Sequence, residues 1–189
     1  MFVHLKDRAL LKISGSDAEA FLQGQLSNDI NKLDACSVQL NAYCQHQGKI
    51  LALFWVLRHE DSFFLSFPSD LLEAIKTRLQ MFIIISDVVI QDITKEYIQV
   101  GSIDETHQEA LVINEKLSLI IAEKKDINKF NMELIDLWDK VCIDYLLPEI
   151  YSITSEKLVP QMLNLDINEF GVNFSKGCYP GQEVVARLH

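Results

Sequence analysis

A cysteine in a turn-rich loop near residue 180 is the strongest candidate for chemistry in this sequence. Cys178 lies in the segment 174–181, and we expect a helix to start one or two residues after it. The unpaired amides and the dipole of a helix N-terminus favour a thiolate; Lys176 and Arg187 add positive charge, while Glu183 opposes it. The thiol is therefore a candidate nucleophile, metal ligand or redox centre, and the alternative is a small buried hydrophobic residue.

A metal site has little support from the sequence. His46 lies two residues after Cys44, but two candidate ligands do not make a site. The four cysteines fit no CxxC pair and no zinc template. Cys36 and Cys142 are expected to be ordinary core or surface thiols, so we predict no metal.

The elements that must position these residues predict an α+β fold. Apolar residues alternate with polar ones over 38–44, which is the period of a half-buried strand. Ser16 and Glu19 are expected to form a capping box ahead of the first helix. Strands are predicted over 9–13, 38–44, 50–58, 63–67, 88–92, 97–101 and 117–122, and helices over 17–26, 68–82, 105–112 and 132–144, with helix composition again over 182–188. Sheets with helices on one face define the α+β class.

Composition excludes several classes of function. A chain of 189 residues suits one large domain or two closely packed small ones. The formal net charge of −10, with no basic stripe, argues against direct binding of nucleic acid. The apolar run 81–85 is too short to span a bilayer, and no leader opens the chain, so we expect a cytoplasmic protein with reduced thiols and no membrane contact.

The loop around the cysteine also carries a recognisable motif. The segment 176–187 reads KGCYPGQEVVAR and resembles the KGCYxGQE-x-x-AR signature of YgfZ-type folate-binding proteins, which are relatives of the glycine-cleavage T-protein. Three further stretches agree in the expected order: FLQGQLSNDI at 21–30, CQHQGKI at 44–50, and PQ followed by NL at 160–165. The segment 85–130 carries no motif of this family.

The resemblance implies a fold and a function. The fold would be two packed antiparallel-sheet/helix domains of the aminomethyltransferase folate-binding fold around a central channel, with the family's C-terminal barrel absent. We assign 1–45 and 140–189 to the first α+β subdomain and 46–139 to the second. The implied cofactor is tetrahydrofolate or a one-carbon derivative. The implied partners are iron–sulfur assembly or client enzymes, including those that modify tRNA.

The resemblance also implies folate-binding residues before the signature. Asp144 occupies the place of an acidic residue, usually Glu, that hydrogen-bonds the pterin ring, although Leu146 replaces the glycine that follows it in relatives. A buried carboxylate suits adjacent N–H donors; the alternative is a solvated carboxylate at a helix end. Trp138 corresponds to an aromatic residue that stacks on the pterin, and the alternative is core packing.

The remaining candidate ligand residues are polar. Asn28 either faces the channel or caps a helix, and Gln161 and Asn164 either bind ligand or order their loop. The signature adds three more candidates: Tyr179, Gln182 and Glu183. Glu183 has the alternative of pairing with a neighbouring cation or capping the helix start.

One comparison argues against transferase activity. T-proteins carry adjacent aspartates after their glycine hairpin, one of them catalytic, where this chain has Ala52 and Leu53. Neither side chain can act as a base, so we expect no aminomethyltransferase activity. A folate-dependent one-carbon transferase remains the first alternative. A folate-free scaffold is the second, because Asp144, Leu146 and Arg8 depart from the family pattern.

Overall fold

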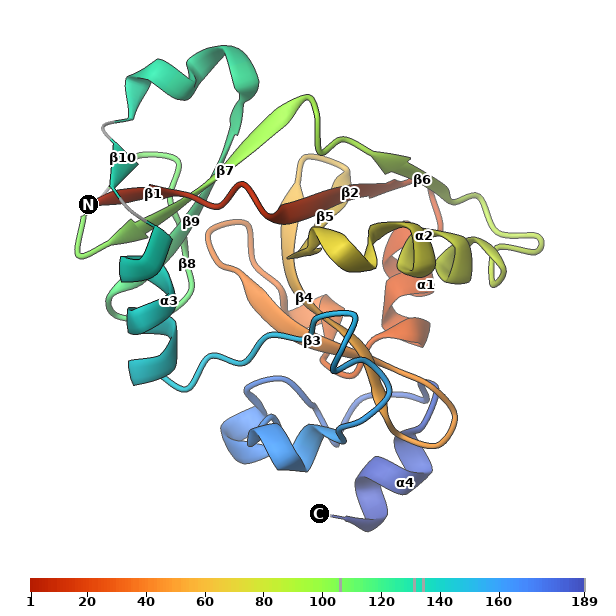
Figure 1. Ribbon diagram of the computed structural model, residues 1–189. Helices are drawn as coiled ribbons and strands as arrows, with labels where there is room; N and C mark the ends of the chain where they lie inside the picture. Colours follow the sequence, from red (N-terminus) through yellow and green to blue (C-terminus); the bar gives the residue numbers. More distant parts are fainter. Residues whose placement is uncertain (106, 131, 134, 189) are drawn as a thin grey trace.

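Two β-sheets and four α-helices form the described structure (Figure 1). The computed structural model describes residues 1–105, 107–130, 132–133 and 135–188. The first sheet has the order β3 (Gln39–Cys44), β4 (Ile50–His59), β5 (Ser62–Pro68), β2 (Arg8–Ser14) and β6 (Val89–Asp92). The second has the order β10 (Met132–Glu133), β1 (Phe2–His4), β7 (Tyr97–Ile103), β9 (Leu117–Glu123) and β8 (Leu111–Val112). The helices are α1 (Ala18–Gln25), α2 (Leu72–Gln80), α3 (Ile135–Asp144) and α4 (Gln182–Arg187).

Short 3-10 turns connect these elements. They are η1 (Ile30–Lys32), η2 (Ser69–Leu71), η3 (Lys124–Lys129), η4 (Pro160–Leu163) and η5 (Ile167–Glu169). Neighbouring strands are antiparallel except for β1 and β10, which run parallel. The α+β class predicted from the sequence is therefore confirmed. No helix in the described part of the chain is both long and apolar enough to cross a lipid bilayer.

The first sheet is buried because its central strands are apolar on both faces. All eight residues from Ile50 to Leu57 are buried, and so is every residue of β5. A strand covered on both sides reads as a continuous apolar run instead of an alternating one. Ala52 and Leu53, which stand where T-proteins carry aspartates, are 0% and 1% exposed.

The main core contains buried residues of both sheets, and the sequence places a subdomain boundary at residue 45. That boundary falls inside the β3–β4 hairpin, whose strands pair throughout. The chain passes from one sheet to the other after β1 and again between β6 and β7, and Gln99 of β7 hydrogen-bonds to residues of the first sheet. Its amide donates to the Ala9 carbonyl oxygen at 3.1 Å, and its Oε1 accepts from Ser66 Oγ at 2.5 Å.

Two of the predicted helices differ from the structure. The helix predicted over 105–112 is wrong: Leu111–Val112 form β8, and residue 106 lies outside the described residues. Val112 donates to the Cys36 carbonyl at 3.0 Å and accepts from Val38 at 2.9 Å, so pairing with a distant segment sets its conformation. The helix predicted over 132–144 starts only at Ile135, because Met132–Glu133 pair with β1.

The chain after α3 covers the end of the β3–β4 hairpin in the lower part of Figure 1. Ile50 donates to the Leu158 carbonyl oxygen at 2.8 Å, and Glu156 donates to that of Ile50 at 2.8 Å. Asn173 donates to the Ser27 carbonyl at 3.0 Å. These backbone bonds fix the segment that leads into the loop of Cys178.

Candidate functional site

A buried lysine anchors the loop that carries Cys178. Lys176 Nζ donates to the carbonyl oxygens of Gln23 at 2.7 Å, Leu26 at 2.6 Å and Asn28 at 2.9 Å. These carbonyls lie at and just beyond the C-terminal end of α1, where backbone acceptors lack helical partners and a cation is favourable. Burial lowers the pKa of Lys176 to about 8, and the charge of Asp29 opposes this shift.

Two further signature residues dock the loop on the β3–β4 turn. Tyr179 is buried, its ring centroid lies 5.5 Å from Lys176 Nζ, and burial raises the pKa of its hydroxyl. Gly181 has a φ of 83°, and a Cβ there would lie 2.4 Å from the Gln45 carbonyl oxygen and 2.8 Å from Gly48 Cα. This close approach requires glycine.

Cys178 is an exposed free cysteine on this fixed loop. The helix predicted to start one or two residues after it begins only at Gln182, with Gly181 as N-cap. The two cations expected near the thiol have partners of their own. Lys176 binds the end of α1, and Arg187 lies 3.9 Å from Glu183 in an exposed ion pair. The loop therefore presents Cys178 to solvent.

A second set of candidate residues surrounds a small cavity between α3 and the N-terminal strands. We call it the α3 cavity, and its volume is about 160 Å³. Its lining residues come from four separate segments: Leu5, Asp7, Arg8, Pro68, Trp138, Asp139, Cys142, Glu149 and Tyr151. It joins aromatic surface to acidic groups, the combination expected for a planar ring that carries N–H donors.

Trp138 lies both in the wall of the α3 cavity and in the core. It lines the α3 cavity, and it is only 7% exposed and belongs to the main core. Its ring packs on β7 at Gly101, where a Cβ would lie 2.3 Å from the indole. A glycine at this position is therefore required for the tryptophan to reach the cavity wall.

Glu149 is the acidic residue held most firmly at the cavity. Its Oε1 accepts hydrogen bonds from Arg8 Nη1 and from Trp55 Nε1, the latter at 3.4 Å. Its Oε2 is buried and has no hydrogen-bond partner among the residues that the structure describes. Arg8 is held in turn by Ser66, to which its Nε donates at 2.7 Å.

Burial and neighbouring charges also shift the pKa values of Asp139 and Cys142, which line the α3 cavity. Burial, with the nearby charges of Asp136 and Asp7, raises the pKa of Asp139. Burial also raises the pKa of Cys142 to about 12, and the charge of Glu149 adds to this shift. The cavity therefore disfavours further negative charge and suits a neutral or donor-rich group.

Asp144 does not line the cavity. It is exposed at the end of α3, whereas Trp138, Asp139 and Cys142 share the face that lines the cavity. Residues four apart lie on one face of a helix, but Asp144 is rotated by about 200° from Cys142. The structure thus has the arrangement of the solvated carboxylate at a helix end.

The remaining predicted ligand residues make hydrogen bonds within the protein. Asn28 Nδ2 donates to the Leu40 carbonyl oxygen at 3.1 Å, and Gln161 Nε2 donates to that of Val185 at 2.6 Å. Asn164 is exposed, and its φ of 56° closes η4. The amide of Gln182 donates to the Tyr179 carbonyl oxygen at 3.2 Å. These contacts order the C-terminal segment and do not bring the residues to the α3 cavity.

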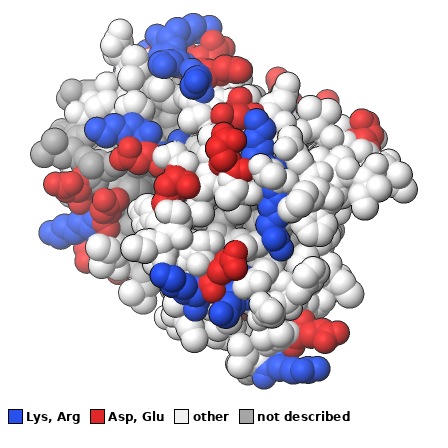
Figure 2. All heavy atoms as spheres, turned by 45° about the vertical axis from the view of Figure 1, so that its right-hand side comes forward, with Lys and Arg blue, Asp and Glu red and all other residues white. Residues whose placement is uncertain are grey.

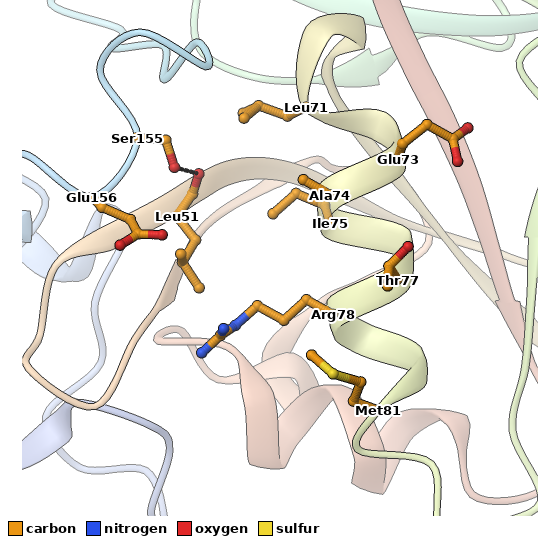
Figure 3. A pocket seen from close by; sticks show the side chains of 10 residues that line it. All are labelled: Leu51, Leu71, Glu73, Ala74, Ile75, Thr77, Arg78, Met81, Ser155 and Glu156. Carbon is orange, nitrogen blue, oxygen red and sulfur yellow. Dashed lines mark hydrogen bonds between the residues drawn. The ribbon is translucent and has the colours of Figure 1, made fainter.

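A larger hollow of about 510 Å³ lies between α2 and the turn at 155–156 (Figure 3). Figure 3 shows Ile75 and Arg78 of α2 facing Leu51 across it, and Ser155 Oγ donates to the Leu51 carbonyl at 2.8 Å. None of the predicted site residues is among the described residues that line it. Within the described part of the chain, no three His, Cys, Asp or Glu side chains are grouped so as to hold a metal ion.

The sequence did not single out Glu149, which lines the α3 cavity. It follows Pro148 directly, five positions after Asp144, and the family motif directs attention to the earlier acid. The available signal was a charged residue between Pro148 and the apolar Ile150, which is 0% exposed. A charge placed next to a buried position needs a partner, but the partner, Arg8, lies 141 residues away.

Comparison with known proteins places these features in context. No protein-family model matches the chain. A protein of Haemophilus influenzae, named only as uncharacterised, is 32% identical over 192 residues, covering 98% of this chain and 68% of that protein. Two proteins named tRNA-modifying protein YgfZ, from Colwellia psychrerythraea and Photobacterium profundum, are 26% and 27% identical. These matches cover 98% of this chain and 66% and 64% of those proteins, so the chain spans about two thirds of its relatives' length.

A solved structure shares the fold at low sequence identity. The crystal structure of glycine cleavage system aminomethyltransferase T from Bartonella henselae superposes with a TM-score of 0.74. The match has 11% sequence identity and covers 98% of this chain and 62% of that one. At this identity the likeness shows the fold alone, with its two antiparallel sheets.

Proposed function

Because the chain belongs to the YgfZ-like proteins of the glycine-cleavage T-protein fold, we propose that it binds tetrahydrofolate or a one-carbon derivative. In this role it supports the assembly or repair of iron–sulfur cluster enzymes in the cytoplasm, including enzymes that modify tRNA. Two of its relatives are named for tRNA modification.

The observation that carries this proposal is the chemistry of the α3 cavity. A pterin is a planar ring with adjacent N–H donors. Trp138 offers an aromatic wall, and Asp7, Asp139 and Glu149 are acidic residues that line the cavity. The volume of about 160 Å³ is below the roughly 300–1,000 Å³ typical of pockets that enclose a whole drug-sized ligand. The residues therefore fit the ring portion of a folate, and the remainder of the molecule lies outside the cavity.

Aminomethyl transfer is not part of the proposal. Ala52 and Leu53 are buried in β4 and carry no group that accepts a proton or binds a cationic amine. We assign the thiol-dependent part of the role to Cys178, because Lys176 and Gly181 hold its loop in a fixed position while its side chain stays exposed.

The surface charge supports a role through protein partners. On the face shown in Figure 2, Lys and Arg side chains are interspersed with Asp and Glu, and the formal net charge of the chain is −10. A protein that binds nucleic acid directly presents a continuous basic surface. We therefore propose that any effect on tRNA passes through a client enzyme.

A titration with tetrahydrofolate tests the proposal. The chain has two tryptophans, and both lie at or next to the cavity: Trp138 lines it, and Trp55 donates to Glu149. We expect saturable quenching of tryptophan fluorescence, matched by calorimetry. The fragment p-aminobenzoyl-glutamate, which lacks the pterin ring, should have no effect at the same concentration.

Loss of the thiol tests the second part of the role. We expect Cys178→Ser to bind tetrahydrofolate like the unmodified protein but to fail in a complementation assay that measures an iron–sulfur enzyme. Absence of saturable folate binding would overturn the proposed function and favour a folate-free scaffold. Full complementation by Cys178→Ser would remove the thiol from the role.

A further inference from the structure

We infer that the hollow between α2 and the turn at 155–156, which we call the α2 hollow, binds an organic monocarboxylate with an apolar body. Arg78 receives the carboxylate, and apolar side chains contact the body of the ligand. Among the described residues, the linings of this hollow and of the α3 cavity have no member in common, so the inference does not depend on the proposed function. The volume of about 510 Å³ lies within the roughly 300–1,000 Å³ typical of pockets for small molecules.

The first observation is the state of Arg78, a half-buried residue that reaches from α2 toward Leu51 across the hollow (Figure 3). It forms no ion pair with any residue that the structure describes. Of its guanidinium nitrogens, only Nε is buried without a hydrogen-bond partner there, so the two Nη groups stay accessible to a ligand. The planar N–H donors of a guanidinium match the two oxygens of a carboxylate.

The aromatic neighbours of Arg78 leave its charge unpaired. Its guanidinium carbon lies 6.0 Å from the centre of the Phe82 ring. Burial raises the pKa of the Tyr43 hydroxyl to about 12, and the charge of Arg78 opposes this rise. Tyr43 is therefore a neutral phenol at pH 7, and neither ring supplies a negative charge. A partly desolvated cation of this kind gains from an anionic partner.

The protein side of the hollow is apolar. Leu51, Leu71 and Ile75 line it and are 5%, 4% and 3% exposed, so the core closes it from below. Met81 also lines it and is 62% exposed. A ligand that covers this side chain gains about 25 cal/mol for each Å² of apolar surface removed from water. The hollow thus offers apolar contact beside a cation, which suits an amphipathic acid.

Two acidic residues limit the charge of the ligand. Glu73 and Glu156 line the hollow and are exposed. Figure 3 shows the Glu73 carboxylate pointing away from Leu51, whereas that of Glu156 points toward it. A second negative charge on the ligand would be repelled by Glu156, which solvent screens only in part. A single carboxylate, placed at Arg78, is therefore favoured over a phosphate.

Octanoate is a suitable probe, because ligands of the same chain length and different charge are at hand. We expect calorimetry to show saturable binding of octanoate and weaker binding of octylamine and of octyl phosphate, which carries more than one negative charge at pH 7. Amide chemical shifts measured by NMR should change in α2 and at 155–156. Octylamine binding as tightly as octanoate, no saturable octanoate binding, or shift changes confined to other segments would overturn the inference.

Arg78→Gln removes the charge and should weaken octanoate binding by roughly 10- to 100-fold, the effect of losing paired hydrogen bonds from a charged donor. Lys76→Met is the matched control on the same helix. Lys76 does not line the hollow, and its charge lies near that of Asp92. The control should change the dissociation constant by less than about twofold, as expected of a substitution outside the site. Unchanged octanoate affinity in Arg78→Gln would overturn the inference.

Ala74→Phe tests the hollow without altering Arg78. Ala74 lines the hollow and is exposed on α2, so a phenyl ring there occupies the space from the solvent side and leaves the core intact. We expect thermal unfolding close to that of the unmodified protein and loss of octanoate binding; retained binding would overturn the inference. Tetrahydrofolate binding should be the same in all these variants. Failure of the unmodified protein to bind tetrahydrofolate would overturn the proposed function alone.

Discussion

Replacing Lys176 with methionine removes an ammonium group while keeping most of the side chain's length. Lys176 is 8% exposed, and its three hydrogen bonds of 2.6–2.9 Å join the signature loop to the end of α1. Methionine retains the apolar stem beside Tyr179 but leaves three carbonyl oxygens without this donor. The substitution therefore tests whether the lysine of the signature is structural.

The expected loss of stability follows from two opposing effects. Each carbonyl left without a donor costs about 1–3 kcal/mol, so three cost on the order of 6 kcal/mol. Burial lowers the pKa of Lys176 from 10.5 to about 8, and a shift of this size corresponds to about 3 kcal/mol that removal of the charge returns. We expect Lys176→Met to lower the free energy of unfolding at pH 7 by about 3 kcal/mol.

The pH dependence has a defined sign. Between pH 8 and pH 10.5 the unfolded state keeps the proton on Lys176 while the folded state loses it. Stability rises with pH wherever the unfolded state binds more protons. This contribution is absent from Lys176→Met, so the difference between the two proteins should grow by up to about 3 kcal/mol across this range.

Urea unfolding followed by tryptophan fluorescence measures both effects. Lys32→Met is the matched control, because Lys32 is 58% exposed and lies 3.3 Å from Glu169 in a surface ion pair. Such pairs contribute about 0–1 kcal/mol. A Lys176→Met protein within 1 kcal/mol of the unmodified one at pH 7, or a difference that shrinks above pH 8, would refute this reasoning.

Two further predictions concern the thiols and the cavity wall. In a Cys36→Ser background at pH 8, a thiol reagent should label exposed Cys178 rapidly and Cys44 slowly, because burial raises the pKa of Cys44 to about 12; equal rates would contradict the assignment. Gly101→Ala should displace the indole on α3, since the new Cβ would lie 2.3 Å from that ring; we expect a loss of about 1–3 kcal/mol in unfolding free energy and weaker folate binding. Unchanged stability, measured by the same urea titration, would show that the ring can move without cost.

Local sequence patterns correctly predicted those strands and helices whose formation depends on interactions between nearby residues. The alternation over 38–44 and the apolar run over 50–58 predicted the hairpin that forms β3 and β4. The helical period over 17–26 correctly predicted α1. The capping box expected from Ser16 and Glu19 is wrong, because neither side chain caps the helix. Ser16 instead donates to Asp87 at 2.9 Å, and Glu19 accepts from Arg58 at 3.1 Å. Distant partners therefore take the place of the local ones.

In the candidate site, too, some features follow from local sequence and others depend on distant residues. The sequence alone indicated the family and the turn-rich loop that carries Cys178, because a short motif is enough to identify both. Only the tertiary structure decided what those residues contact. Lys176 donates to the end of α1, and Glu149 accepts from Arg8 across 141 positions of sequence. Burial and charge pairing depend on the folded neighbours of a side chain, and no spacing along the chain encodes those.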